Sequence, residues 1–173
     1  MEKFHFNTRL LTRQALIAAV YAVLTYSAQG FAYGPIQFRY SEVLNWLCFL
    51  DPKNVIGLSL GCFLSNLTSP FGLIDLFFGT LHTAIACMFM AKMRSRYIAA
   101  LGAALFSFII ALELLLIGEI NGGLFLETYF TIALSELIIV AVIGLPLFLL
   151  LTQFKDLTAR LEDRTMAPVK RKE

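Results

Sequence analysis

The 173-residue chain is 58% hydrophobic and only 15% charged, well below the roughly 25% charged residues of a soluble domain. Residues 14–38 and 54–74 contain no charged side chain, and a membrane-spanning helix needs about 20 mostly apolar residues. These features exclude an ordinary soluble domain. They predict an all-α membrane protein that lies in a lipid bilayer and binds no nucleic acid.

The first half of the chain is predicted to hold a short arm and three helices. These elements are a cytoplasmic arm at 1–9 and helices at 10–28, 40–50 and 52–67. Gly30, Gly34 and Pro35 fall in the outer loop that follows the first helix, where such residues end helices and shape turns. The second helix is too short to cross a bilayer unaided. It therefore either dips back from a partly buried loop or lies within the bundle.

The second half is predicted to hold three longer helices and a tail. The helices cover 73–91, 97–117 and 125–153, and a charged cytoplasmic tail covers 154–173. The last helix is interrupted at Gly144-Leu145-Pro146, because proline removes a backbone donor. The six helices of 10–153 are predicted to form one transmembrane domain.

The positive charges predict the orientation of these helices. Every Lys and Arg except Arg39 falls in a segment that six crossings place on one side of the membrane. Short basic segments stay cytoplasmic, so both termini are expected in the cytoplasm. Arg39, on the outer side, is the first residue to suspect of a special role.

Several acids accompany Arg39 in or beside the apolar segments, namely Glu42, Asp75, Glu113, Glu119, Glu127 and Glu136. A charge inside a bilayer costs several kcal/mol unless it faces a partner or a polar cavity, so each acid is a functional candidate. Glu119 and Glu127 are equally compatible with a simple loop position. An acidic excess near the outer side suits a cation or a ligand rich in hydrogen-bond donors.

One face of the fourth helix combines a carboxylate, an aromatic ring, a glycine and an imidazole. Asp75, Phe78, Gly79 and His82 follow the spacing i, i+3, i+4 and i+7, which places them on one side of a helix. This pattern is typical of a ligand-facing stripe. It is also typical of a packing notch at Gly79 and a satisfied buried histidine at His82.

The first helix carries alanines at the same spacing, Ala15, Ala18, Ala19 and Ala22. Small residues in such a strip let another membrane helix approach closely. The other helix belongs either to a partner protein or to this same bundle, and the spacing alone favours neither.

Motifs for catalysis and energy conversion are missing from the sequence. It contains no GxxxxGK[ST] phosphate loop, no HExxH and no GxSxG, which are signatures of ATP hydrolysis, zinc proteases and serine hydrolases. Cys48, Cys62 and Cys87 lack the paired spacing of a metal site. We predict a protein that is not an enzyme and uses no cofactor or metal.

Three segments resemble the QueT family. They are Gly34 to Leu44, with its Gln-Phe-Arg-x-Ser-Glu run, Gly57 to Cys62 with Asn66, and Gly72 to Gly79. The resemblance extends over most of the chain, from the first helix to about Gln153. It implies a substrate-binding subunit (S component) of an energy-coupling factor importer, a six-helix bundle of the bacterial cell membrane. Its expected substrate is a queuosine precursor, a 7-deazaguanine such as preQ1 or queuine.

The resemblance also implies partners and a site. S components dock through an alanine-rich first helix onto a membrane coupling protein driven by two cytoplasmic ATPases, which makes the alanine strip a docking face. The outer loop closes over a pocket near the outer surface. The residues expected to line or brace it are Gln37, Arg39, Glu42, Asn66, Asp75, Phe78, His82 and Glu136.

The chemistry of such a ligand fits these residues. A carboxylate accepts the paired amide and amino donors of a 7-deazaguanine, Phe78 or Trp46 stacks on the ring, and Asp75 or Glu136 takes an ammonium substituent. Arg39 is interpreted as a structural partner of Glu42. The alternatives are an S component for another small vitamin and a self-sufficient proton-coupled carrier that uses Glu113 and Glu136. A membrane enzyme using Asp75 and His82 has no supporting motif.

Overall fold

The computed structural model describes residues 8–27 and 38–154. Expectations for most of the arm, for most of the outer loop including Gln37, and for nearly all of the tail lie outside these residues. The described part is helical and contains no strand. Its elements are α1 (Thr8–Ser27), the 3-10 helix η1 (Tyr40–Asn45), α2 (Trp46–Leu50), α3 (Asn54–Asn66), α4 (Leu73–Lys92), α5 (Arg96–Ala99), α6 (Gly102–Phe106), α7 (Phe108–Leu116), the 3-10 helix η2 (Gly122–Leu124), α8 (Phe125–Leu137), the π-helix η3 (Ile138–Gly144) and α9 (Leu145–Leu151).

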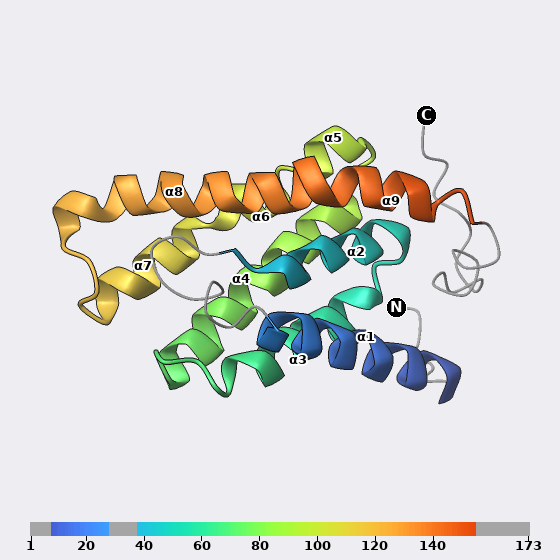
Figure 1. Ribbon diagram of the computed structural model, residues 1–173, viewed down its shortest axis with the longest axis horizontal. Coiled ribbons are helices and arrows are strands. Elements are labelled where there is room, and N and C mark those ends of the chain that lie inside the picture. Colours follow the sequence, from blue (N-terminus) through green and yellow to red (C-terminus); the bar gives the residue numbers. More distant parts are fainter. Residues whose placement is uncertain (1–7, 28–37, 155–173) are drawn as a thin grey trace, which may run out of the picture.

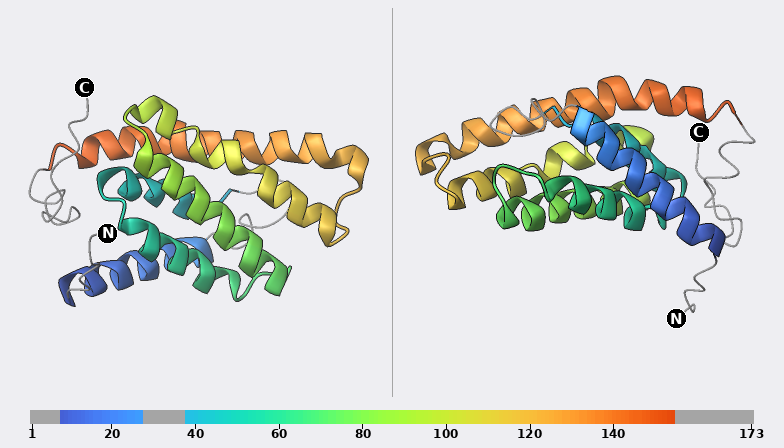
Figure 2. Two further views of the ribbon diagram at one scale, coloured as in Figure 1. Left: turned by 180° about the vertical axis from the view of Figure 1, so that it is seen from behind. Right: turned by 60° about the horizontal axis from the view of Figure 1, so that its bottom comes forward.

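The helices form a bundle around a short central segment (Figure 1). One long ribbon of α8, η3 and α9 runs along one side of the molecule, and α1 and α3 lie together on the opposite side. The helix α4 runs between these two sides, with η1 and α2 beside it (Figure 2). The predicted all-α membrane fold is confirmed.

The outer surface of the bundle suits lipid. Four helical stretches of the described chain are long and apolar enough to cross a membrane: Thr8–Ser27, Leu73–Lys92, Arg96–Leu116 and Gly122–Leu151. Large apolar side chains such as Leu73, Phe77 and Val142 are exposed on them. The shorter helix α3 has 13 residues. It reaches about 20 Å at 1.5 Å per residue.

The short second segment is tucked within the bundle. Its residues Trp46, Leu47, Cys48 and Phe49 are all buried, and the indole Nε1 of Trp46 donates a hydrogen bond to the Val140 carbonyl at 2.8 Å. This bond satisfies a carbonyl inside the π-helix, where the normal helical pairing changes. Of the two arrangements compatible with its length, the structure shows the buried one.

The last two predicted helices are less regular than expected. The predicted helix 97–117 is divided into α5, α6 and α7. The Ala103 carbonyl there accepts a hydrogen bond from Ser107 Oγ at 3.0 Å and lies 3.0 Å from His82 Nε2. Side chains that compete for a helix carbonyl bend and loosen the helix. In the last segment the irregular stretch is the π-helix η3, which ends at Gly144, the first residue of the predicted interruption.

The close packing of α1 on α3 buries two of the four alanines of the strip and leaves the other two exposed. A Cβ on Gly61 would lie 2.8 Å from the Ala18 carbonyl oxygen and 2.7 Å from the Tyr21 Cβ, so this glycine allows the two helices to touch. Ala18 and Ala22 are buried within the chain, 2% and 8% exposed, whereas Ala15 and Ala19 are exposed. Half of the strip therefore packs inside this bundle.

Candidate functional site

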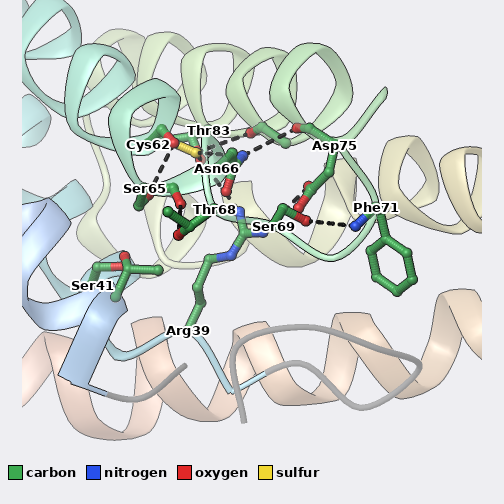
Figure 3. Close-up of polar contacts among 12 residues, drawn as sticks. Arg39, Ser41, Cys62, Ser65, Asn66, Thr68, Ser69, Phe71, Asp75 and Thr83 are labelled. Atoms are coloured by element: carbon green, nitrogen blue, oxygen red, sulfur yellow. Dashed lines mark hydrogen bonds and ion pairs between the residues drawn. The ribbon is translucent and has the colours of Figure 1, made fainter. Parts of the chain in front are cut away.

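Arg39 lies at the centre of a buried polar group. It is 2% exposed, and its Nη2 lies 3.6 Å from Asp75 Oδ1 in the first turn of α4. Figure 3 shows the side chain extending from the start of η1 toward Asn66 and Asp75. The isolated positive charge of the sequence is thus placed against a carboxylate deep in the protein.

Asn66 and Gly79 shape the space around this ion pair. Asn66 Nδ2 donates to the Asp75 carbonyl oxygen at 3.1 Å, which ties the end of α3 to the start of α4. A Cβ on Gly79 would lie 2.4 Å from Asn66 Nδ2 and 2.8 Å from Asp75 Oδ1. Gly79 is therefore a close-approach position for polar groups.

Cys62 takes part in the same group. Arg39 Nη1 donates to its sulfur at 3.7 Å, and its thiol donates to the Gly79 carbonyl at 3.4 Å. Thr83 Oγ1 also lies 3.3 Å from this sulfur. The Cys62 thiol therefore takes part in the hydrogen bonding of this cluster as well as in its packing, although hydrogen bonds that involve sulfur are weak at these distances.

Glu42 belongs to a second buried network beside the first. Its carboxylate accepts a hydrogen bond from Tyr21 Oη at 2.6 Å and another from Asn45 Nδ2, and Thr83 Oγ1 lies 3.0 Å away. These donors come from α1, η1 and α4. The ion pair found for Arg39 is with Asp75, not with its predicted partner Glu42, because the side chain crosses to α3 and α4.

Two further acids are buried near Arg39. Glu113 on α7 is 1% exposed and Glu136 on α8 is 2% exposed. Among the described residues, neither oxygen of Glu113 has a hydrogen-bond partner, and the Oε2 of Glu136 has none either. Arg39 is close enough to both side chains to act on them electrostatically. Buried carboxyl groups with open acceptor positions are expected at a ligand site rather than in an inert core.

The aromatic and imidazole candidates occupy different surroundings. His82 is buried, and its Nε2 lies 3.0 Å from the Ala103 carbonyl, which favours the satisfied buried histidine. The Trp46 ring stacks on Phe148 at 4.7 Å between centroids and belongs to an apolar core cluster. Phe78 is half-buried and contacts Phe77 edge to face. Of the two proposed stacking rings, Phe78 is on the same helix face as Asp75.

The remaining acids and a surface groove lie apart from this site. Glu119 and Glu127 are exposed, which agrees with a simple loop or helix-end position. Within 8–27 and 38–154 no cluster of His, Cys, Asp or Glu has the arrangement of a metal site. A groove of about 350 Å³ beside α4 is lined almost entirely by apolar side chains, including the exposed Leu73 and Phe77. Its lining matches the lipid-facing surface, so it is separate from the polar site.

Some residues of these networks were not selected from the sequence. Tyr21 and Thr83 hold Glu42. Thr83 follows Gly79 by four residues and so continues the face of Asp75, a signal that helical spacing contained. Tyr21 had no such signal, because its partner comes from another helix. At the opposite end of α1, Gln14 Nε2 donates to Asn54 Oδ1 at 3.2 Å.

An apolar exterior around a buried charged centre defines the class of this protein, a small multi-pass helical membrane protein with a polar interior site. The chain belongs to the QueT transporter family, whose profile matches residues 11–153. It is 34% identical over 139 residues to the queuosine precursor transporter QueT of Lactococcus lactis subsp. cremoris strain MG1363, an alignment that covers 70% of this chain and 80% of the relative. No solved structure matches the chain.

Family and fold together establish the general role. The protein is a multi-pass transport protein of the bacterial cell membrane, and the resemblance to the QueT family is confirmed. The relative's name indicates a small-molecule substrate.

Proposed function

We propose that this protein is the substrate-binding S component of an energy-coupling factor importer and captures a queuosine precursor from outside the cell. The observation that carries the proposal is the buried group around Arg39, in which Glu113 and Glu136 keep open acceptor oxygens. A 7-deazaguanine presents several N–H donors, and charge-assisted hydrogen bonds to carboxylates contribute about 1.5–3 kcal/mol each. The name of the related transporter supports this substrate class.

The candidate residues divide into those that meet the ligand and those that brace the site. Glu136 and Phe78 are proposed ligand contacts, with Arg39 and Asp75 as the charged pair at the edge of the pocket. Asn66, Glu42 and His82 hold helices together through the bonds described above. Gln37 lies outside the described residues and remains a proposed contact.

The direct test is ligand binding by the purified chain alone. Calorimetry with preQ1, preQ0, queuine and guanine should show tight, selective binding of a 7-deazaguanine without any ATPase. Glu136→Gln should weaken this binding without lowering the melting temperature, because it removes only a charge. Failure of wild-type protein to bind any of the four compounds would contradict the proposed substrate class.

Energy is proposed to come from other chains, a membrane coupling protein and two cytoplasmic ATPases. The proposed docking surface is the exposed part of α1 around Ala15 and Ala19, flanked by Leu16 and Val23. Small residues there leave room for a partner helix. Ala15→Trp and Ala19→Trp should abolish co-purification with the coupling protein and preserve ligand binding, while Leu147→Trp on exposed α9 should change neither.

A proton-coupled carrier is a second candidate, favoured by the two buried acids Glu113 and Glu136. Reconstitution in vesicles separates the candidates. An S component binds ligand but does not accumulate it without its ATPases, whereas a carrier accumulates ligand when a proton gradient alone is applied.

A further inference from the structure

The buried acids differ in how far their oxygens are already occupied. Asp75 is paired with Arg39 at 3.6 Å, and the Glu42 carboxylate is held by the Tyr21 and Asn45 side chains. Among the described residues, both oxygens of Asp75, both oxygens of Glu113 and the Oε2 of Glu136 are buried without a hydrogen-bond partner. Unlike Asp75, Glu113 has two buried oxygens that are neither hydrogen-bonded nor ion-paired among the described residues.

The position of Glu113 directs this capacity toward the site. It lies in the last turn of α7, on the buried face with Ile110 and Leu114. That helix packs against both α4 and α8, the elements that carry Asp75 and Glu136. This packing places Glu113, on the buried face of α7, among the helices that carry the buried charges. Glu113 is 1% exposed, so water is a poor substitute for a missing hydrogen-bond partner of its carboxyl group.

We infer that Glu113 is the specificity-determining residue that accepts the lactam N–H and the exocyclic amino N–H of the 7-deazaguanine ring. The inference rests on the proposed function and names the residue for one edge of its ligand. A carboxylate accepts two parallel N–H donors through its two oxygens, and both oxygens are open on Glu113. Sites that hydrogen-bond a substrate group strongly reject an analogue without it, because the protein group is then left buried and unpaired.

The test combines a protein change with a ligand change. Wild type, Glu113→Gln and the control Glu119→Gln are titrated with 7-deazaguanine and with 7-deazahypoxanthine, which lacks the amino group. Glu119 is the same residue type in an exposed position. Wild type and control should bind 7-deazaguanine roughly 10- to 100-fold more tightly than the analogue. Glu113→Gln should bind both ligands weakly and almost equally.

The melting temperature of the ligand-free variant separates a binding role from a structural one. Glu113→Gln should melt at or above the wild-type temperature, because it removes a buried acid without partners among the described residues. A Glu113→Gln protein that keeps the preference for 7-deazaguanine overturns the inference and leaves the proposed function standing. Absence of preference in wild type also overturns the inference without any variant. Wild-type protein that binds neither compound overturns the inference, and failure to bind preQ1, preQ0 and queuine as well overturns the proposed function too.

Discussion

Single residues in this protein show how a membrane bundle holds charges in its interior. Glu42 is fully buried and is held by donors from different elements, whereas Glu113 is buried with both oxygens open. Hydrogen-bonded buried charges stabilise the arrangement around them, and unbonded ones are unfavourable unless a ligand completes them. The same residue type therefore serves as a brace in one place and as a candidate contact in another.

At Glu42 this difference predicts a loss of stability. Glu42→Gln replaces an acceptor oxygen by an NH₂ group that faces the Tyr21 or Asn45 donor. The free energy of unfolding should fall by about 1.5–3 kcal/mol, measured by denaturation in detergent micelles. Glu127→Gln on the exposed surface is the matched control and should have no effect. Equal melting of the two variants would contradict the bracing role.

Gly79 is expected to tolerate no side chain. In Gly79→Ala the new Cβ would lie 2.4 Å from Asn66 Nδ2 and 2.8 Å from Asp75 Oδ1, so these groups have to move. Overpacking of this kind costs about 1–3 kcal/mol, and ligand binding should weaken with it. Gly122→Ala is the control, since a Cβ there meets nothing within 4 Å. Calorimetry and thermal melting on both variants check the prediction.

At the scale of elements, α1 packs extensively on α3 and also contacts η1. Tyr21 of α1 reaches Glu42, Thr25 Oγ1 donates to Ser41 Oγ at 2.8 Å, and Gln14 meets Asn54 at the opposite end. The helix α1 is therefore bonded along its length to the elements that carry the site. Its exposed face remains open to lipid or a partner.

The buried and exposed alanines of α1 should behave differently. Ala18→Leu places a larger side chain against Gly61 of α3 and should lower the free energy of unfolding by about 1–3 kcal/mol. Ala15→Leu, on the exposed side, should leave it unchanged within about 0.5 kcal/mol. Thermal melting in micelles compares the two, and equal destabilisation would contradict the division of the strip.

At the scale of the whole molecule, the basic loops and the outer loops should lie on opposite sides of the membrane. The native cysteines at positions 48, 62 and 87 are buried, so an added cysteine is the accessible one. Ser95→Cys should react with an impermeant maleimide only in inside-out vesicles, and Gly122→Cys only in intact cells. Labelling of both from the same side would contradict the predicted crossings.

Much of the fold was predictable because a helix that crosses lipid needs a continuous apolar stretch, which is visible in the sequence. All six predicted helical segments occur, including the short one at 40–50. The break between α6 and α7 was not predictable, because it depends on His82 and Ser107, whose side chains both approach the Ala103 carbonyl. Likewise the sequence allowed the Trp46 ring to stack on a ligand, whereas in the structure this ring stacks on Phe148.

The sequence by itself determined the membrane class, the order of helices and the interior charges to examine. Each follows from local apolarity or charge, which the bilayer selects residue by residue. Only the tertiary structure decided that Arg39 pairs with Asp75, that Ala18 faces inward and Ala15 outward, and that Glu113 has open oxygens. These outcomes depend on how each helix is rotated against its neighbours. That rotation is set by contacts between residues far apart in the chain.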